Sequence, residues 1–280
     1  MKPGLTSAEL EYCREAALKS GGLFEFTSRF LPAERCEEYL ALYALVRTIQ
    51  LIPSAHVDDE IIWAKLKWWS EELAAQPESV SRHPLLRALW ASGARKKIDN
   101  SLLQGLIRGA LSCIDVAPDS DENVFFERLA VLGLTSIEME LALDEAVIDK
   151  ELGRYLAAAS GIFAFLISFG KDRPPEYEQI PLNILAEFNL SVAQLKQQPA
   201  DLAQVITRIA GLGLSWFSQG MAGLDGAKQR RAGKHLRLRW EMEARSLLKI
   251  KKNAAGFLET GIRYGPMDAW FAWRLLRQLY

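Results

Sequence analysis

The stretch LALYALVRTIQLI, residues 40–52, is apolar around almost its whole circumference when it is drawn as a helix. A helix of this kind is expected where other elements surround it on all sides. Pro53 follows directly, and proline disfavours helix at the residue before it. We therefore expect a buried helix over Leu40–Ile52 that ends at Pro53, with the rest of the fold organised around it.

Helical periodicity fills the remainder of the chain. Ile62, Leu66, Trp69 and Leu73 recur with the spacing of one helix face, and Gly105 and Gly109 would let a neighbouring helix approach closely. Further helical patterns occur at Ile98–Ile114, Phe125–Ile148, Leu152–Phe169, Leu202–Trp216, His235–Leu258 and Met267–Leu279. Because no alternating strand pattern and no linker interrupts them, we predict a single all-α domain over residues 1–280.

Composition narrows the class of protein. The 280 residues are 49% hydrophobic, which is enough for a large core, and the net charge of −1 gives no reason to expect nucleic acid as a partner. Cys13, Cys36 and Cys113 are too sparse for a disulfide framework and are typical of a reducing compartment. Since no signal peptide and no run of eighteen apolar residues is found, we expect a cytoplasmic protein.

Several short motifs occur along the chain in a fixed order. They are Leu31-Pro32, Tyr43-Ala44 with Arg47, Trp68-Trp69, and the turn at Ile180-Pro181. With them the chain resembles the squalene and phytoene synthase family of head-to-head prenyl transferases, from about Ser20 to the C-terminus. The resemblance implies a large helical bundle of the isoprenoid synthase type. It also implies a central apolar cavity that holds a prenyl or lipid ligand.

The resemblance implies two aspartate-rich sites, whose magnesium ions hold the substrate diphosphate. In the first site, the family's aspartates fall three, four and seven residues after the arginine. The residues at these positions here are Gln50, Leu51 and Ser54. None of them is anionic. Asp58 and Asp59 are either displaced replacements or, as we favour, first-turn residues of the next helix, where carboxylates complement the helix dipole.

The second acidic site is also depleted. Counting back from Pro181, the family's second aspartate is retained as Asp172, whereas the first is Ser168 and the preceding asparagine is Ala164. We expect Asp172 to pair with a neighbouring basic residue, although it remains the one candidate metal ligand. The family-equivalent pocket positions are thus Arg47, Gln50, Ser54, Ser168 and Asp172.

Two classes of function follow from this resemblance. The first is a non-catalytic binding or assembly protein that needs no cofactor, similar to the complex I assembly factor relatives of the family. The alternative is an active prenyl transferase that uses magnesium, an atypical ligand set, and farnesyl or geranylgeranyl diphosphate.

A basic segment and a set of aromatic residues leave further alternatives open. Lys228–Lys252 carries ten Lys or Arg against two Glu, which predicts either a solvated helix face or a site for an anionic membrane surface or acidic protein partner. The residues assigned to this surface are Lys234, Arg237, Arg239, Lys249 and Lys251. Such binding would place the protein peripherally at the inner membrane face.

Either core packing or an apolar pocket is expected of Trp63, Trp68, Trp69, Phe163, Phe165, Trp216 and Phe217. His83, just before Pro84, is expected to be structural.

Overall fold

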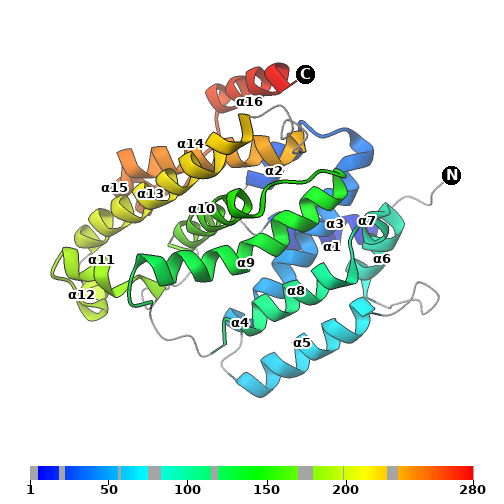
Figure 1. The fold of residues 1–280 in the computed structure, drawn as a ribbon, viewed down its shortest axis with the longest axis horizontal. Helices are drawn as coiled ribbons and strands as arrows, with labels where there is room; N and C mark the ends of the chain where they lie inside the picture. Colours follow the sequence, from blue (N-terminus) through cyan, green and yellow to red (C-terminus); the bar gives the residue numbers. More distant parts are fainter. Residues whose placement is uncertain are drawn as a thin grey trace. The chain divides into compact units, whose positions relative to one another are not determined.

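The computed structural model describes residues 6–18, 23–55, 58–74, 83–114, 119–169, 179–197, 199–225 and 233–279. Within these ranges the chain forms helices and turns without a strand, so the predicted all-α class is confirmed (Figure 1). The chain divides into two compact units. The first comprises Met1–Val116 and Thr135–Val147, and the second comprises Ala117–Leu134 and Ile148–Tyr280.

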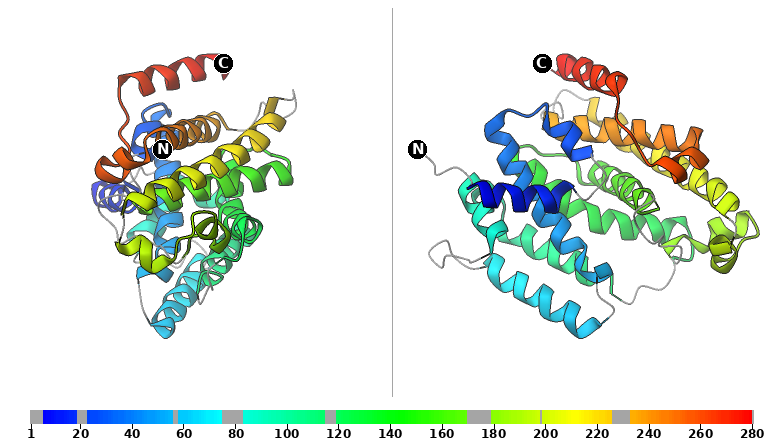
Figure 2. Two further views of the ribbon diagram at one scale, coloured as in Figure 1. Left: turned by 90° about the vertical axis from the view of Figure 1, so that its left-hand side faces the viewer. Right: turned by 180° about the vertical axis from the view of Figure 1, so that it is seen from behind.

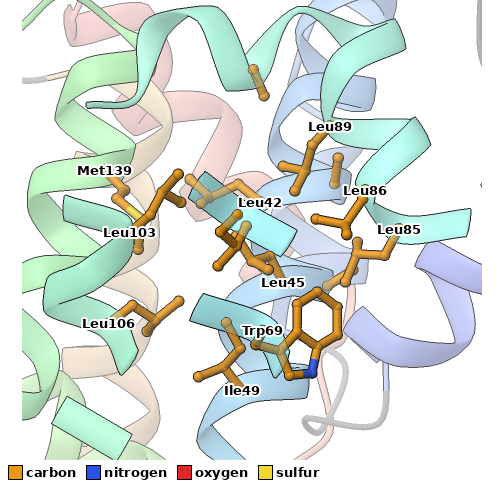
Figure 3. Packing of buried hydrophobic residues seen from close by; sticks show 14 of the residues in the cluster. Leu42, Leu45, Ile49, Trp69, Leu85, Leu86, Leu89, Leu103, Leu106 and Met139 are labelled. Carbon is orange, nitrogen blue, oxygen red and sulfur yellow. The ribbon is translucent and has the colours of Figure 1, made fainter. Parts of the chain in front are cut away.

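The first unit has its core around one central helix, α3. Its helices are α1 (Ser7–Leu18), α2 (Leu23–Ser28), α3 (Ala33–Gln50), α4 (Ile52–Ala55), α5 (Asp59–Ala74), α6 (Pro84–Ser92), α7 (Ala94–Lys97), α8 (Asn100–Leu111) and the second half of α9 (Glu122–Leu143). In Figure 3, Leu42 and Leu45 of α3 lie between side chains of α6 and side chains of α8. The expectation of a buried helix is therefore confirmed.

The end of α3 differs slightly from the expectation. Leu51 caps the helix and donates its backbone N–H to the Arg47 carbonyl at 3.1 Å. Pro53 has no N–H to offer the Ile49 carbonyl, so the ladder of hydrogen bonds cannot continue past this point. The short helix α4 then begins at Ile52, because proline is tolerated in the first turn of a helix.

Helix α5 confirms the interpretation of the acidic residues after Pro53. Asp59 and Glu60 occupy its first turn, and an Asp58 carboxylate oxygen accepts the Glu60 backbone N–H at 2.9 Å. These carboxylates complement the N-terminal end of a helix. The predicted apolar face is also confirmed, since the buried residues of α5 are Ile62, Leu66, Trp69 and Leu73.

Close approach of two helices in the first unit depends on Gly105 of α8. A Cβ atom at this position would lie 3.1 Å from Cγ2 of Thr135 in α9, which is tighter than ordinary packing. The close neighbour that the sequence predicted at Gly105 is therefore confirmed.

The second unit is built on three long helices. It contains the first half of α9, then α10 (Lys150–Ser168), α11 (Leu182–Glu187), α12 (Val192–Gln197), α13 (Pro199–Ala222), a 3-10 turn (Gly223–Asp225), α14 (Lys234–Lys252), α15 (Ala254–Thr260) and α16 (Pro266–Leu279). Helix α13 packs against both α10 and α14 (Figure 1). Its predicted apolar stripe, from Leu202 to Trp216, is buried.

Two helix ends in this part of the chain correct the sequence prediction. Helix α9 ends at Leu143, not Ile148, because Glu145 adopts a φ of 53° and Ala146 donates its N–H to the Leu141 carbonyl. The predicted helix His235–Leu258 is two helices. Asn253 separates them and accepts the Gly256 N–H with its side chain, as a cap of α15. Among the described residues, no helix has the length and apolar character needed to cross a membrane.

Candidate functional site

A row of polar contacts joins α3 to the second half of α9 within the first unit. The Tyr43 hydroxyl donates to a Glu140 carboxylate oxygen at 2.9 Å, and the Arg35 guanidinium donates to the Leu143 carbonyl at 2.9 Å and pairs with Asp144. Near the end of α3, the Gln50 amide donates to the Ser136 hydroxyl at 3.5 Å. We call these contacts the α3–α9 polar row. They attach one face of α3 to its neighbour through hydrogen bonds.

The positions of the first acidic motif lie at the C-terminal end of this row. Gln50 is the last residue of α3 and bonds to Ser136, while Leu51 is the C-terminal cap and carries no donor atom for a metal. Arg47 is half-buried, and Ser54 belongs to α4, beyond the break in the helix. These positions therefore bring no carboxylate to this end of α3.

The second acidic motif begins at the end of α10 in the second unit. Ser168 is its last residue, is buried, and donates its hydroxyl to the Phe165 carbonyl at 2.6 Å. Asp172 lies outside the described residues. The turn that follows the motif is ordered by Arg128, which donates to Gln179 at 3.4 Å and pairs with Asp119 at 2.7 Å. Pro181 then leads into α11.

The described residues do not fit the magnesium cluster that the resemblance implies. Magnesium requires hard oxygen ligands, usually carboxylates, in near-octahedral geometry. Leu51 offers none, and the Ser168 hydroxyl is engaged with its own helix. Within the part of the chain that the structure describes, no group of three or more His, Cys, Asp or Glu is arranged to hold a metal ion.

Helix α14 forms ion pairs within the second unit through three of its basic residues, Arg239, Arg245 and Lys249. Arg239 is buried and its guanidinium donates to Glu243 at 2.6 Å, while Ser160 of α10 donates to the same carboxylate at 2.6 Å. Arg239 was expected on an anionic binding surface. This was wrong for that residue, because its charge is neutralised by Glu243 inside the unit.

Two of these ion pairs lie in the C-terminal half of α14. Lys249 and Arg245 both bond to Asp268 of α16, at 2.8 and 2.9 Å. Burial of Asp268 disfavours its charge, but hydrogen bonds from Gly265, Lys249 and Arg245 outweigh it, and the pKa of the carboxyl is lowered. Of the remaining residues assigned to this surface, Arg237 is half-buried, and Lys234 and Lys251 are exposed.

The first unit contains an apolar pocket of about 560 Å³. Its lining residues are Thr48, Ile52, Ile61, Ala64, Lys65, Trp68, Trp69 and His83. Trp68 and Trp69 thus line a pocket as expected, whereas Trp63 is 54% exposed. The α3 residue in this lining is Thr48. Because successive side chains of a helix differ in direction by about 100°, Thr48 and the pocket lie on a different face of α3 from Arg47 and Gln50.

His83 at the pocket wall confirms its predicted structural role. It is the N-cap of α6, where its Nδ1 accepts the Leu85 N–H at 3.2 Å, and its ring packs edge-on against Trp69. Burial lowers the pKa of His83 and favours the neutral ring that can accept this hydrogen bond. The predicted core role is confirmed for Phe163, Phe165, Trp216 and Phe217, which are all buried.

Comparison with known proteins agrees with this arrangement of helices. The family model described as squalene/phytoene synthase matches residues 19–267. The structure is similar to a dehydrosqualene synthase in complex with ligand, with a TM-score of 0.69, 15% identity, and 97% of this chain and 95% of that chain covered. It is also similar to squalene synthase HpnC from Alicyclobacillus acidocaldarius, with a TM-score of 0.66, 16% identity, and 91% and 96% covered. No curated protein matches the sequence.

Proposed function

The chain belongs to the squalene/phytoene synthase family, and we propose that it is a non-catalytic member, which binds a prenyl or lipid ligand without ionising it. The observation that carries the proposal is the chemistry at the positions of the acidic motifs. At these positions Gln50 offers an amide, Leu51 offers an aliphatic side chain, and Ser168 offers a hydroxyl that is hydrogen-bonded within its own helix. Departure of a diphosphate needs several carboxylates on a metal cluster to neutralise the developing charge.

An apolar ligand is supported by the pocket of the first unit. Its walls are mostly aliphatic and aromatic carbon, and Lys65 places one cation at its lining. A hydrocarbon chain with an anionic end matches this combination of surfaces. Such a ligand would be held by burial of apolar area, which requires no metal.

The alternative is an active prenyl transferase with an atypical ligand set. It is favoured by one observation, namely that the sequence retains Asp172 at the position of the family's second aspartate. In that case the enzyme would use farnesyl or geranylgeranyl diphosphate and magnesium. A single carboxylate holds hydrated magnesium weakly, so the binding role is preferred.

A thermal-shift titration separates the two functions. We expect farnesyl or geranylgeranyl diphosphate to stabilise the protein, by about 2.7 kcal/mol when the ligand is at a hundred times its Kd. The shift should be the same with magnesium and with a chelator, because binding involves no metal. A shift that appears only with magnesium would support the enzyme. No shift with either ligand would contradict prenyl diphosphate binding.

The proposal also includes a place for the protein, peripheral at an anionic membrane surface. This is supported by the exposed cations Lys234 and Lys251 of α14 and by exposed aromatic side chains elsewhere in the second unit. Assembly with a protein partner, as in the complex I assembly factor relatives, remains the other form of a non-catalytic role.

A further inference from the structure

We propose that the outer face of α16 is a membrane-binding surface that contacts an anionic lipid bilayer. The face consists of Met267, Trp270, Trp273, Arg274 and Arg277, which recur at helical spacing along one side of the helix. The proposal rests on the membrane location proposed above and identifies the surface responsible. It does not depend on whether the protein is catalytic.

The outer face of α16 exposes large apolar side chains to solvent. Met267, Trp270 and Trp273 are 68%, 51% and 49% exposed. Consecutive large apolar residues on one helix face normally pack against something, because leaving them in water forfeits their burial free energy. Helix α16 lies at an edge of its unit in all three ribbon views, next to α14 (Figures 1 and 2).

The opposite face of α16 attaches the helix to the protein. Ala272 is fully buried, and Asp268 is buried and bonded to Arg245 and Lys249 of α14. The Arg245 guanidinium also lies over the Phe271 ring, 4.9 Å from its centroid. The helix is thus held by its inner face, while the aromatic residues of its outer face point away from those contacts.

The charges of this face select an anionic lipid surface as the occupant. Arg274 lies over the Trp270 indole at 5.5 Å and Arg277 over the Trp273 indole at 4.7 Å. Asp268 is the only acidic residue in α16, and it is paired on the inner face. Indole rings prefer the region between headgroups and acyl chains, and adjacent arginines attract anionic headgroups.

Helix α5 of the first unit shows what distinguishes this surface. Trp63 is 54% exposed there, as much as either tryptophan of α16. However, α5 carries four acidic residues, Asp59, Glu60, Glu71 and Glu72, against two lysines. An anionic bilayer would repel this helix, so Trp63 provides a matched control for an exposed tryptophan outside the proposed surface.

Sedimentation with lipid vesicles tests the proposal on the full chain. We expect the protein to bind vesicles of phosphatidylcholine mixed with phosphatidylglycerol more tightly than vesicles of phosphatidylcholine alone, and salt to weaken the binding. Trp270→Ala with Trp273→Ala should lower the partition coefficient at least about tenfold. Arg274→Gln with Arg277→Gln should lower it about tenfold for anionic vesicles and reduce its dependence on salt.

The control Trp63→Ala should bind as the unmodified protein does. Circular dichroism and thermal unfolding of each variant should match the unmodified protein, because the changed side chains are exposed. Three results would overturn the proposal: no binding of the unmodified protein to anionic vesicles, unchanged binding of Trp270→Ala with Trp273→Ala, or an equal loss with Trp63→Ala. The prenyl diphosphate titration contains no lipid vesicles, so its outcome is independent of the outcome of the sedimentation experiment.

Discussion

Asp268 is the residue on which the ionic contacts of α14 and α16 converge. Its carboxylate accepts hydrogen bonds from Arg245 and Lys249, and from the Gly265 backbone N–H at 2.9 Å. We predict that Asp268→Asn destabilises the protein by about 1–3 kcal/mol at neutral pH, since Asn retains the Gly265 bond but loses the charge shared with two partly exposed cations. Urea unfolding measures the loss. Asp121→Asn, an exposed cap of α9, is the control and should have little effect.

The same residue predicts a pH dependence. Because the folded protein lowers the pKa of Asp268, its contribution to stability is present above the unfolded pKa of about 3.9 and disappears as the pH falls through the lower folded pKa. The difference in unfolding free energy between the unmodified protein and Asp268→Asn should therefore shrink below about pH 4. A difference that stays constant between neutral and acidic pH would contradict the role of the charge.

At the scale of helices, close packing around α13 predicts that two Gly→Ala substitutions change stability in opposite directions. A Cβ atom at Gly213 would lie 2.7 Å from Leu247 of α14 and 2.9 Å from Ile162 of α10, whereas at Gly211 the nearest atom is the end of Lys251 at 3.7 Å. We expect Gly213→Ala to destabilise by about 1–3 kcal/mol through overpacking. Gly211→Ala lies two residues earlier in the same helix, where a Cβ atom has room, and should stabilise by about 0.5–1 kcal/mol. Thermal unfolding of the pair would contradict this if both shifts had the same sign.

At the scale of the whole molecule, helical periodicity was sufficient to predict the class of the fold and the buried faces of α5 and α13. Periodicity was less informative about where each helix ends. A turn such as that at Glu145, or a cap such as Asn253, depends on local backbone geometry and not on the spacing of apolar residues. The absence of the first set of aspartates could be predicted from the sequence by counting residues from Arg47. The contacts of Glu243 with Arg239 and Ser160 could not be predicted, because Ser160 belongs to another helix that the sequence does not identify as the neighbour.

The last prediction concerns catalysis by the whole protein. We expect no head-to-head product from farnesyl or geranylgeranyl diphosphate with magnesium or manganese. Loss of one transition-state electrostatic contact typically costs about 3–4 kcal/mol, and loss of a metal cluster should cost more. The measurement is extraction of hydrocarbon after incubation with radiolabelled substrate.

A variant with Gln50→Asp, Leu51→Asp, Ser54→Asp and Ser168→Asp should also remain inactive. The break before Pro53 places residue 54 in α4 rather than in the register of α3, and residue 168 is buried, where a new carboxylate is costly to ionise. Product formed by the unmodified protein, and abolished both by a chelator and by Asp172→Ala, would contradict the non-catalytic role. That result would establish Asp172 as part of a working metal site, because neither treatment removes an apolar binding surface.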